Sequence, residues 1–408
     1  MVDGVYFYYG WLIVGGSLAI TLLYGIFYAF GVFFTPISNE FGWTSAEISA
    51  ALSLHAVTYT LSAILMGKLT DAYGPKVPLA IGGTLVGLGL ILSGHIKMLL
   101  HFYLFYGFLA SMGVGAIFIP TYSTVIRWFI KRRGLALGLV AVGAGLGALL
   151  IPPFCERLIA LYGWRETFMV CGGLSWAVML VGVLIFKNPS KEVLKEHVEI
   201  PSGFEPSEAE EVSRQNITLS MALRTKVFWL LLLMYILFFA STYIPITHVV
   251  PFAVAIGISS LTAAGALSLY GASSILGRLT IGFLSDKIGR ISALIICFIL
   301  LAVSISSLIF VQEFFTLYLL VAIFGYAFGG CIPQMPAIIG DFFGSKSVGA
   351  IYGVYEGIAF GIGGAIGPVL GGLLKDVTGG YGASFLVGGL MSALALIPLV
   401  TVRLLTKK

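Results

Sequence analysis

The sequence predicts an all-α membrane protein in which twelve transmembrane helices form two pseudo-symmetric bundles of six. Three observations favour this fold: an apolar composition, apolar stretches of spanning length, and an internal repeat. Of the 408 residues, 59% are apolar and only 10% are charged, whereas a soluble domain has about 25% charged residues. A soluble fold with so little charge would expose large apolar patches. The composition therefore excludes a soluble enzyme, a nucleic-acid module and a disordered scaffold.

Twelve apolar stretches are long enough to cross a bilayer. A spanning helix needs about 20 apolar residues, because each adds about 1.5 Å across about 30 Å of hydrocarbon. The expected spans cover residues 10–37, 46–70, 76–95, 99–126, 134–160, 165–187, 222–256, 260–284, 290–311, 315–340, 346–374 and 380–404. The first has no basic region before it and no small-residue cleavage site, so we expect it to be a span and not a signal peptide.

Lysine and arginine in the loops predict that both termini are cytoplasmic, since positive charge gathers on that side of a membrane. In this orientation the outer loops hold Lys97, Arg157, Arg165 and Lys375, while the cytoplasmic loops hold basic clusters such as residues 131–133. We expect a multi-pass protein of the cell inner (plasma) membrane.

A polar stretch over residues 188–221 divides the chain. It contains three prolines and mixes lysine with glutamate, as a solvated linker does. We therefore expect an N-terminal bundle over 1–187, a cytoplasmic linker over 188–221 and a C-terminal bundle over 222–408.

An internal repeat relates these two halves. The stretch Gly67–Lys76 returns as Gly282–Arg290, in each case between the second and third spans of its half. The offset from Asp71 to Asp286 is 286 − 71 = 215, and the same offset pairs Pro36 with Pro251, Gly134 with Gly349 and Pro153 with Pro368. Parallel repeats of this kind bind their substrates near the bilayer midplane, between the halves.

These motifs resemble those of a known family. The pattern G-x-x-x-D-x-x-G in both halves resembles the signature loop of the major facilitator superfamily. Within it, the segment Arg127–Gly138 and the sequence His248-Val-Val-Pro251-Phe resemble the monocarboxylate transporter and oxalate/formate antiporter branch. The resemblance implies the major facilitator fold, a secondary transporter, and a carboxylate-binding arginine in the eighth helix.

Two ionisable residues, Arg278 and Glu356, are expected inside the membrane, where each costs about 2.5–3.5 kcal/mol on insertion scales. Arg278 precedes the loop residue Asp286 by eight residues, which places it about 12 Å into the bilayer. A guanidinium binds a carboxylate through two parallel hydrogen bonds. We expect Arg278 to anchor the substrate; the alternative is a structural arginine bound to helix carbonyls. Its repeat mate is Ala63, so the fold does not require a cation there.

Glu356 lies seven residues after Gly349, about 10 Å into the bilayer and so at a depth similar to that of Arg278. It is a candidate for proton coupling or for the counter-ion of Arg278. The alternative is a protonated carboxyl group that packs against another helix. The repeat mate of Glu356 is Ala141.

His248, in the seventh span, is the second candidate for proton coupling and a candidate substrate ligand, because imidazole titrates near neutral pH. The alternative is a packing histidine with a satisfied ring. Aromatic residues are expected to shape the cavity, with Tyr122 and Tyr326 as the preferred pair; the whole group is Tyr24, Tyr28, Phe118, Tyr122, Tyr326 and Tyr352.

The remaining charged residues are expected to hold the cytoplasmic ends of the helices together. Asp71 and Asp286 should bind the free N–H groups at the starts of the eleventh and fifth helices. Arg127 and Asp341, at the ends of the fourth and tenth helices, are expected to latch the two halves; the alternative is that both are solvated.

Together these features favour a proton-coupled symporter of small monocarboxylates such as lactate or pyruvate, working by alternating access. Its partners would be the carboxylate, protons and the bilayer, and it would act as a monomer. No cofactor, metal, nucleic acid or enzymatic activity is expected, since metalloprotease motifs and activated nucleophiles are missing from the sequence. The alternatives are a proton-independent organic anion exchanger of the oxalate/formate type and a non-transporting nutrient receptor.

The chain departs from the families that it resembles. Animal-type monocarboxylate carriers pair the arginine of helix 8 with an aspartate one turn earlier, where this chain has Ser274. Their proton route therefore cannot be carried over. The oxalate exchanger has a second cation in helix 11, where this chain has Glu356, which should disfavour a dicarboxylate by charge repulsion.

Overall fold

The computed structural model describes residues 9–130, 132–190 and 217–406. In these ranges twelve helical segments are long and apolar enough to cross a membrane, which confirms the expected number. Nine of them begin within two residues of the expected start. The linker prediction falls mainly on residues 191–216, which lie outside the described residues.

Six crossings come from the first half of the chain. They are built from α1 (Tyr9–Leu22), α2 (Gly25–Tyr28), α3 (Phe30–Phe41), α4 (Ser45–Tyr73), α5 (Lys76–Ser93), α6 (Leu99–Phe102), the π-helix η1 (Tyr103–Ala110), α7 (Ser111–Trp128), α8 (Arg133–Tyr162) and α9 (Trp164–Ile185). The first crossing is divided among α1, α2 and α3. It therefore differs from the single helix that the sequence predicts.

The second half supplies the other six crossings. Its elements are α12 (Leu219–Ala222), α13 (Lys226–Ala255), α14 (Ser260–Ile288), α15 (Arg290–Ser307), the 3-10 turn η2 (Leu308–Phe310), α16 (Phe314–Phe343), α17 (Val348–Thr378), α18 (Gly382–Leu394) and α19 (Leu396–Thr406). The offset found in the sequence returns in the helix bounds: α4 and α14 differ by 260 − 45 = 215, and α8 and α17 by 348 − 133 = 215.

Matching local signals set the ends of α4 and α14. The Thr44 hydroxyl accepts a hydrogen bond from the Glu47 N–H and the Glu47 carboxylate accepts one from the Thr44 N–H, a capping box that starts α4. Ser259 caps α14 in a similar way. Each helix stops at a glycine with positive φ, Gly74 at +79° and Gly289 at +86°, a conformation that costs glycine little.

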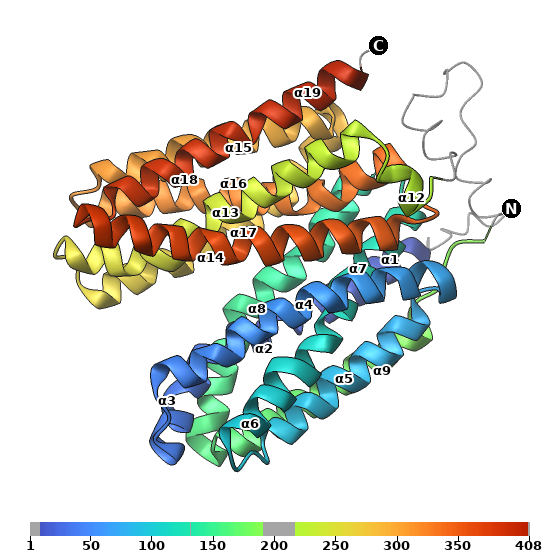
Figure 1. Ribbon diagram of the computed structural model, residues 1–408. Coiled ribbons are helices and arrows are strands. Elements are labelled where there is room, and N and C mark those ends of the chain that lie inside the picture. Colours follow the sequence, from blue (N-terminus) through green and yellow to red (C-terminus); the bar gives the residue numbers. More distant parts are fainter. Residues whose placement is uncertain (1–8, 131, 191–216, 407–408) are drawn as a thin grey trace, which may run out of the picture.

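The helices form two groups along the sequence (Figure 1). Elements α1 to α9, blue to green, lie together, and α13 to α19, yellow to red, lie beside them. The start of α1, α12 and the end of α19 lie at the same end of the molecule, which we call the linker end. The ribbons of the two groups meet closely at this end and diverge toward the other.

Glycines bring the two groups into backbone contact along α4–α17 and α8–α14. A Cβ at Gly67 would collide with the Gly349 carbonyl oxygen, and one at Gly138 would lie 2.5 Å from the Arg278 carbonyl oxygen. Small residues allow such close approach in membranes, where helix packing depends on van der Waals contact. We call these two helix contacts the bundle seams, and the functional site is built from residues beside them.

Candidate functional site

A cavity of about 70 Å³ lies between the two bundles. Its wall is mostly aromatic and takes residues from both halves: Tyr24, Tyr28, Tyr59, Phe118, Tyr122 and Ala144 from the first, and Phe239, Tyr243, Arg278, Phe328, Ile332, Met335, Tyr352, Glu356 and Phe360 from the second. The charged members of this wall are Arg278 and Glu356. The structure thus brings together the two intramembrane charges that the sequence singles out.

Arg278 lies on α14 at one side of the cavity and is only 6% exposed. Its Nη1 donates a hydrogen bond of 2.7 Å to the Ala141 carbonyl oxygen on α8, across the bundle seam. Its Nε is buried and has no hydrogen-bond partner. Gly145 on α8 leaves room for the guanidinium, since a Cβ there would lie 2.5 Å from Nη1. Arg278 therefore binds a neutral carbonyl oxygen, and its Nε–H group remains available to donate a further hydrogen bond.

Glu356 reaches the same cavity from α17 and is partly buried. The hydroxyls of Tyr59 and Tyr352 stand near its carboxyl group. Among the described residues, no ion pair within 4.0 Å joins Glu356 to Arg278. The counter-ion contact considered for this pair is therefore not formed in this conformation.

Tyr122 lines the cavity, as expected, but Tyr326 does not. The Tyr326 hydroxyl accepts a hydrogen bond of 2.9 Å from Thr280, an exposed residue of α14. The cavity face of α16 carries Phe328, Ile332 and Met335. Tyr326 precedes Phe328 by two residues, a rotation of about 200° at 3.6 residues per turn. The prediction for Tyr326 was therefore wrong: its side chain lies on the opposite face of α16.

Four of the other aromatic residues expected at the cavity do line it: Tyr24, Tyr28, Phe118 and Tyr352. The expectation missed five aromatic residues: Tyr59 on α4, Phe239 and Tyr243 on α13, Phe328 on α16 and Phe360 on α17. A signal was available for Tyr243, because a tyrosine four residues after a phenylalanine places two rings on one helix face.

His248 lies outside the cavity wall. Its Nε2 is 2.9 Å from the Pro368 carbonyl oxygen of α17, and its ring centroid is 5.6 Å from that of Tyr381. Gly371 makes room for the ring, because a Cβ there would lie 2.7 Å from the imidazole Cδ2. His248 therefore packs between α13 and α17 in this conformation, and the expectation that it binds substrate stays a prediction.

Asp71 and Asp286 bind helix starts, as the sequence predicts. The Asp71 carboxylate accepts hydrogen bonds from the N–H groups of Gly349 at 2.9 Å and Ala350 at 2.6 Å, at the start of α17. Asp286 accepts from Gly134 at 2.9 Å and from Leu135 at 3.0 Å, at the start of α8. Each aspartate thus crosses from one bundle to the other at the linker end, where the helix dipole favours an anion.

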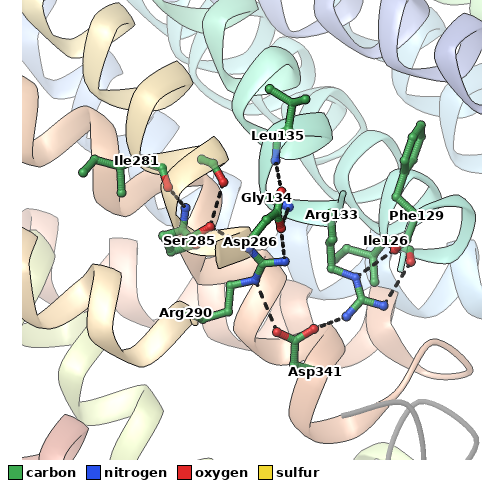
Figure 2. A network of polar contacts seen from close by, with 12 residues as sticks. Ile126, Phe129, Arg133, Gly134, Leu135, Ile281, Ser285, Asp286, Arg290 and Asp341 are labelled. Atoms are coloured by element: carbon green, nitrogen blue, oxygen red, sulfur yellow. Dashed lines mark hydrogen bonds and ion pairs between the residues drawn. The ribbon is translucent and has the colours of Figure 1, made fainter. Parts of the chain in front are cut away.

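The latch between Arg127 and Asp341 is not formed. Arg127 instead pairs with Asp71 of its own bundle at 2.5 Å and donates to the Ser345 carbonyl oxygen at 3.2 Å. Asp341 pairs with Arg133, at the first turn of α8, and with Arg290 at 3.3 Å (Figure 2). Arg133 lies beyond the turn that ends α7, so it reaches α16 while Arg127 remains beside α4. An ion pair does join the two bundles through Asp341, but its arginine is Arg133 and not Arg127.

Known proteins share both the sequence pattern and the fold. The sequence model of the protein family described as the Major Facilitator Superfamily matches residues 16–280 and 249–408 of this chain. Monocarboxylate transporter 13 of Bos taurus is 28% identical over 384 residues, which cover 93% of this chain and 86% of the relative. The uncharacterized MFS-type transporter YhjX of Escherichia coli (strain K12) is 26% identical over 355 residues, with 86% and 85% covered.

Solved structures support the same assignment of the fold. The transporter FucP in its outward conformation superimposes with a TM-score of 0.74 at 16% identity, covering 96% of this chain and 99% of that one. The xylose symporter XylE superimposes with a TM-score of 0.73 at 14% identity, with 95% and 94% covered. The family model spans the chain, the fold agrees with it, and the intramembrane charges lie where the two halves meet. The chain therefore belongs to the Major Facilitator Superfamily of membrane transporters.

Proposed function

We propose that this transporter carries small monocarboxylates, such as lactate or pyruvate, together with a proton. The observation that carries the proposal is Arg278: a buried cation on the wall of an aromatic cavity, bound to a carbonyl and not to a carboxylate. The names of the curated relatives support the substrate class, since several are monocarboxylate transporters.

Arg278 suits the anchoring of one carboxylate. A charged side chain inside a membrane costs about 2.5–3.5 kcal/mol on insertion scales, and function is the usual reason for keeping it. The unpartnered Nε and the remaining N–H groups provide donors for the two oxygens of a carboxylate. A single anchoring cation matches a monoanion better than a dicarboxylate.

Glu356 supplies a reason for proton coupling. An ionised Glu356 would repel an anion held in the same small cavity, because like charges a few ångströms apart interact strongly in a medium of low dielectric constant. A proton on Glu356 removes this repulsion, so that anion and proton enter together. His248, whose ring contacts the Pro368 carbonyl, lies away from this exchange.

Transport would proceed by rocking of the two bundles, 1–187 and 222–408, about the cavity between them. The contacts of Asp71, Asp286 and Asp341 across the bundles close the linker end in this conformation. We propose that this end faces the cytoplasm and that the protein resides in the plasma membrane.

Uptake of labelled lactate into proteoliposomes, with and without an imposed inward proton gradient, tests the proposal. We expect accumulation with the gradient and only equilibration without it. Glu356→Gln should abolish the response to the gradient, while Glu313→Gln, at an exposed carboxyl before α16, should keep it. Lactate counterflow that does not depend on pH in the unmodified protein would instead indicate the anion exchanger.

A further inference from the structure

We propose that the cavity also binds and transports small zwitterionic amino acids, with the carboxylate on Arg278 and the ammonium group on Glu356. The inference rests on the proposed function, because Arg278 anchors the carboxylate in both. It goes further by giving Glu356 a direct role in substrate recognition and by naming a second substrate class.

The two charges approach the cavity from different sides. Arg278 is on α14, which packs against α8 through Gly138, whereas Glu356 is on α17, which packs against α4 through Gly353. Among the residues described by the structure they are not within 4.0 Å of each other, yet both line one cavity of about 70 Å³. A cation and an anion on separate walls of one small cavity are complementary to a ligand with both charges.

Neither charge has an ionic partner within the described parts of the chain. Arg278 donates to the neutral Ala141 carbonyl and keeps a buried, unpartnered Nε. Glu356 has the hydroxyls of Tyr59 and Tyr352 near it. The other charged or titratable groups that line the cavity with Glu356 are Arg278 on α14 and six tyrosines: Tyr24, Tyr28, Tyr59, Tyr122, Tyr243 and Tyr352.

Charge balance links the two substrate classes. With both residues ionised the cavity is neutral, so a monoanion adds one uncompensated negative charge unless a proton is bound with it. A zwitterion adds no net charge, and its ammonium group occupies the place of that proton beside Glu356. Lactate should therefore travel with a proton, whereas an amino acid of the same size needs none.

The aromatic wall suits an ammonium group. Tyrosine faces attract cations within about 6 Å of the ring centroid, with an energy that grows when water is excluded. Tyr59 and Tyr352 lie on either side of the seam at Glu356, and both line the cavity. The hydroxyl group of lactate in the same position would form hydrogen bonds but would gain no cation–π attraction. The site thus separates alanine from lactate by charge and not by shape.

Alanine and lactate are matched probes, because they differ only by an ammonium group in place of a hydroxyl group. Labelled L-alanine and L-lactate are supplied to proteoliposomes that contain the full chain, with and without an inward proton gradient. We expect each to compete with the other, lactate accumulation to respond to the gradient, and alanine uptake not to respond. Propionate, which lacks both groups, controls for the contribution of the carboxylate.

Variants of Arg278 and Glu356 test which residue binds the carboxylate and which binds the ammonium group. Arg278→Ala should lose the uptake of both substrates. Glu356→Gln should lower alanine uptake at least tenfold while lactate uptake continues without pH dependence. Glu356→Asp keeps the charge on a shorter side chain and should restore part of the alanine uptake, which separates recognition from misfolding. Arg224→Ala, at an exposed loop arginine, is the matched control for Arg278→Ala.

The outcomes separate this inference from the proposed function. If lactate is transported through Arg278 but alanine neither moves nor competes, the inference is overturned and the function stands. If Glu356→Gln lowers the uptake of both substrates equally, Glu356 does not recognise the ammonium group. If neither substrate moves, or if both are unaffected by Arg278→Ala, the proposed function fails and the inference fails with it.

Discussion

Arg133 at the start of α8 forms an ion pair with Asp341 at the end of α16, and so joins the two bundles at the linker end. Arg133 is only 2% exposed, and Asp341 also binds Arg290, which in turn pairs with Asp286 at 2.6 Å (Figure 2). These ion pairs lie along the same contact between α8 and α14 that holds Arg278. They must break for the linker end to open.

Asp341→Asn should therefore favour opening at the linker end. The change leaves the Arg133 guanidinium buried without its ionic partner, and removal of one partner of a buried pair costs about 3–5 kcal/mol. We expect longer distances between spin labels placed on either side of this end, and a lower melting temperature. Asp376→Asn, which breaks an exposed pair with Lys375, is the control and should change neither. An unaltered distance distribution in Asp341→Asn would show that the pair is not a latch.

Gly145→Ala should weaken substrate binding although it replaces no charged residue. A Cβ at position 145 would lie 2.5 Å from Arg278 Nη1 and 2.9 Å from Ile275, so the guanidinium must move. We expect the KM for lactate to rise about tenfold, equivalent to about 1.4 kcal/mol. Gly173→Ala, where a Cβ meets nothing within 4 Å, should keep the original KM. Equal KM values in the two variants would mean that the position of the guanidinium does not matter.

His248→Ala should lower stability more than affinity. Its ring makes a contact of 2.9 Å with the Pro368 carbonyl oxygen and lies outside the cavity wall. The lost hydrogen bond is worth about 1 kcal/mol, so the melting temperature should fall by a few degrees. Lactate uptake should keep a KM within about twofold of the original. A tenfold rise in KM, with the protein still folded, would return His248 to the substrate site.

The two tyrosines that the sequence favours equally should behave differently. Tyr122→Phe removes a hydroxyl group from the cavity wall, whereas Tyr326→Phe removes one that binds Thr280 on the far side of α16. We expect the first change to raise the KM for lactate, a hydroxy acid, and the second to leave it as it was. Initial rates of uptake over a range of lactate concentrations measure both. A larger effect at Tyr326 would contradict the orientation of α16.

The contacts of Asp71 and Asp286 could be predicted because they depend on local sequence and on the repeat. Each aspartate sits in a loop motif, and the helix start that it binds is a fixed position in the other half. The apolar spans were predictable for a similar reason, since the length of hydrocarbon that they cross is constant. Arg278 and Glu356 stood out because charge is rare in these spans.

Side-chain direction on the helices was harder to predict. α16 is largely apolar around its circumference, so its sequence gives little indication of which face meets the cavity, and the expectation put Tyr326 on the wrong face. Arg127 and Arg133 flank the turn between α7 and α8, and only the geometry of that turn decides which one reaches Asp341. Both errors concern rotation about a helix or the path of a turn, which hydrophobicity does not determine.

The central claim is that Arg278 anchors a carboxylate in the cavity between the bundles. Equilibrium binding of labelled lactate to the purified protein, unmodified and with Arg278→Ala, tests it most directly because no gradient or conformational cycle is involved. Loss of two charge-assisted hydrogen bonds should weaken binding about 100-fold, or about 3 kcal/mol. Lactate that binds to a folded Arg278→Ala variant with its original affinity would contradict the account.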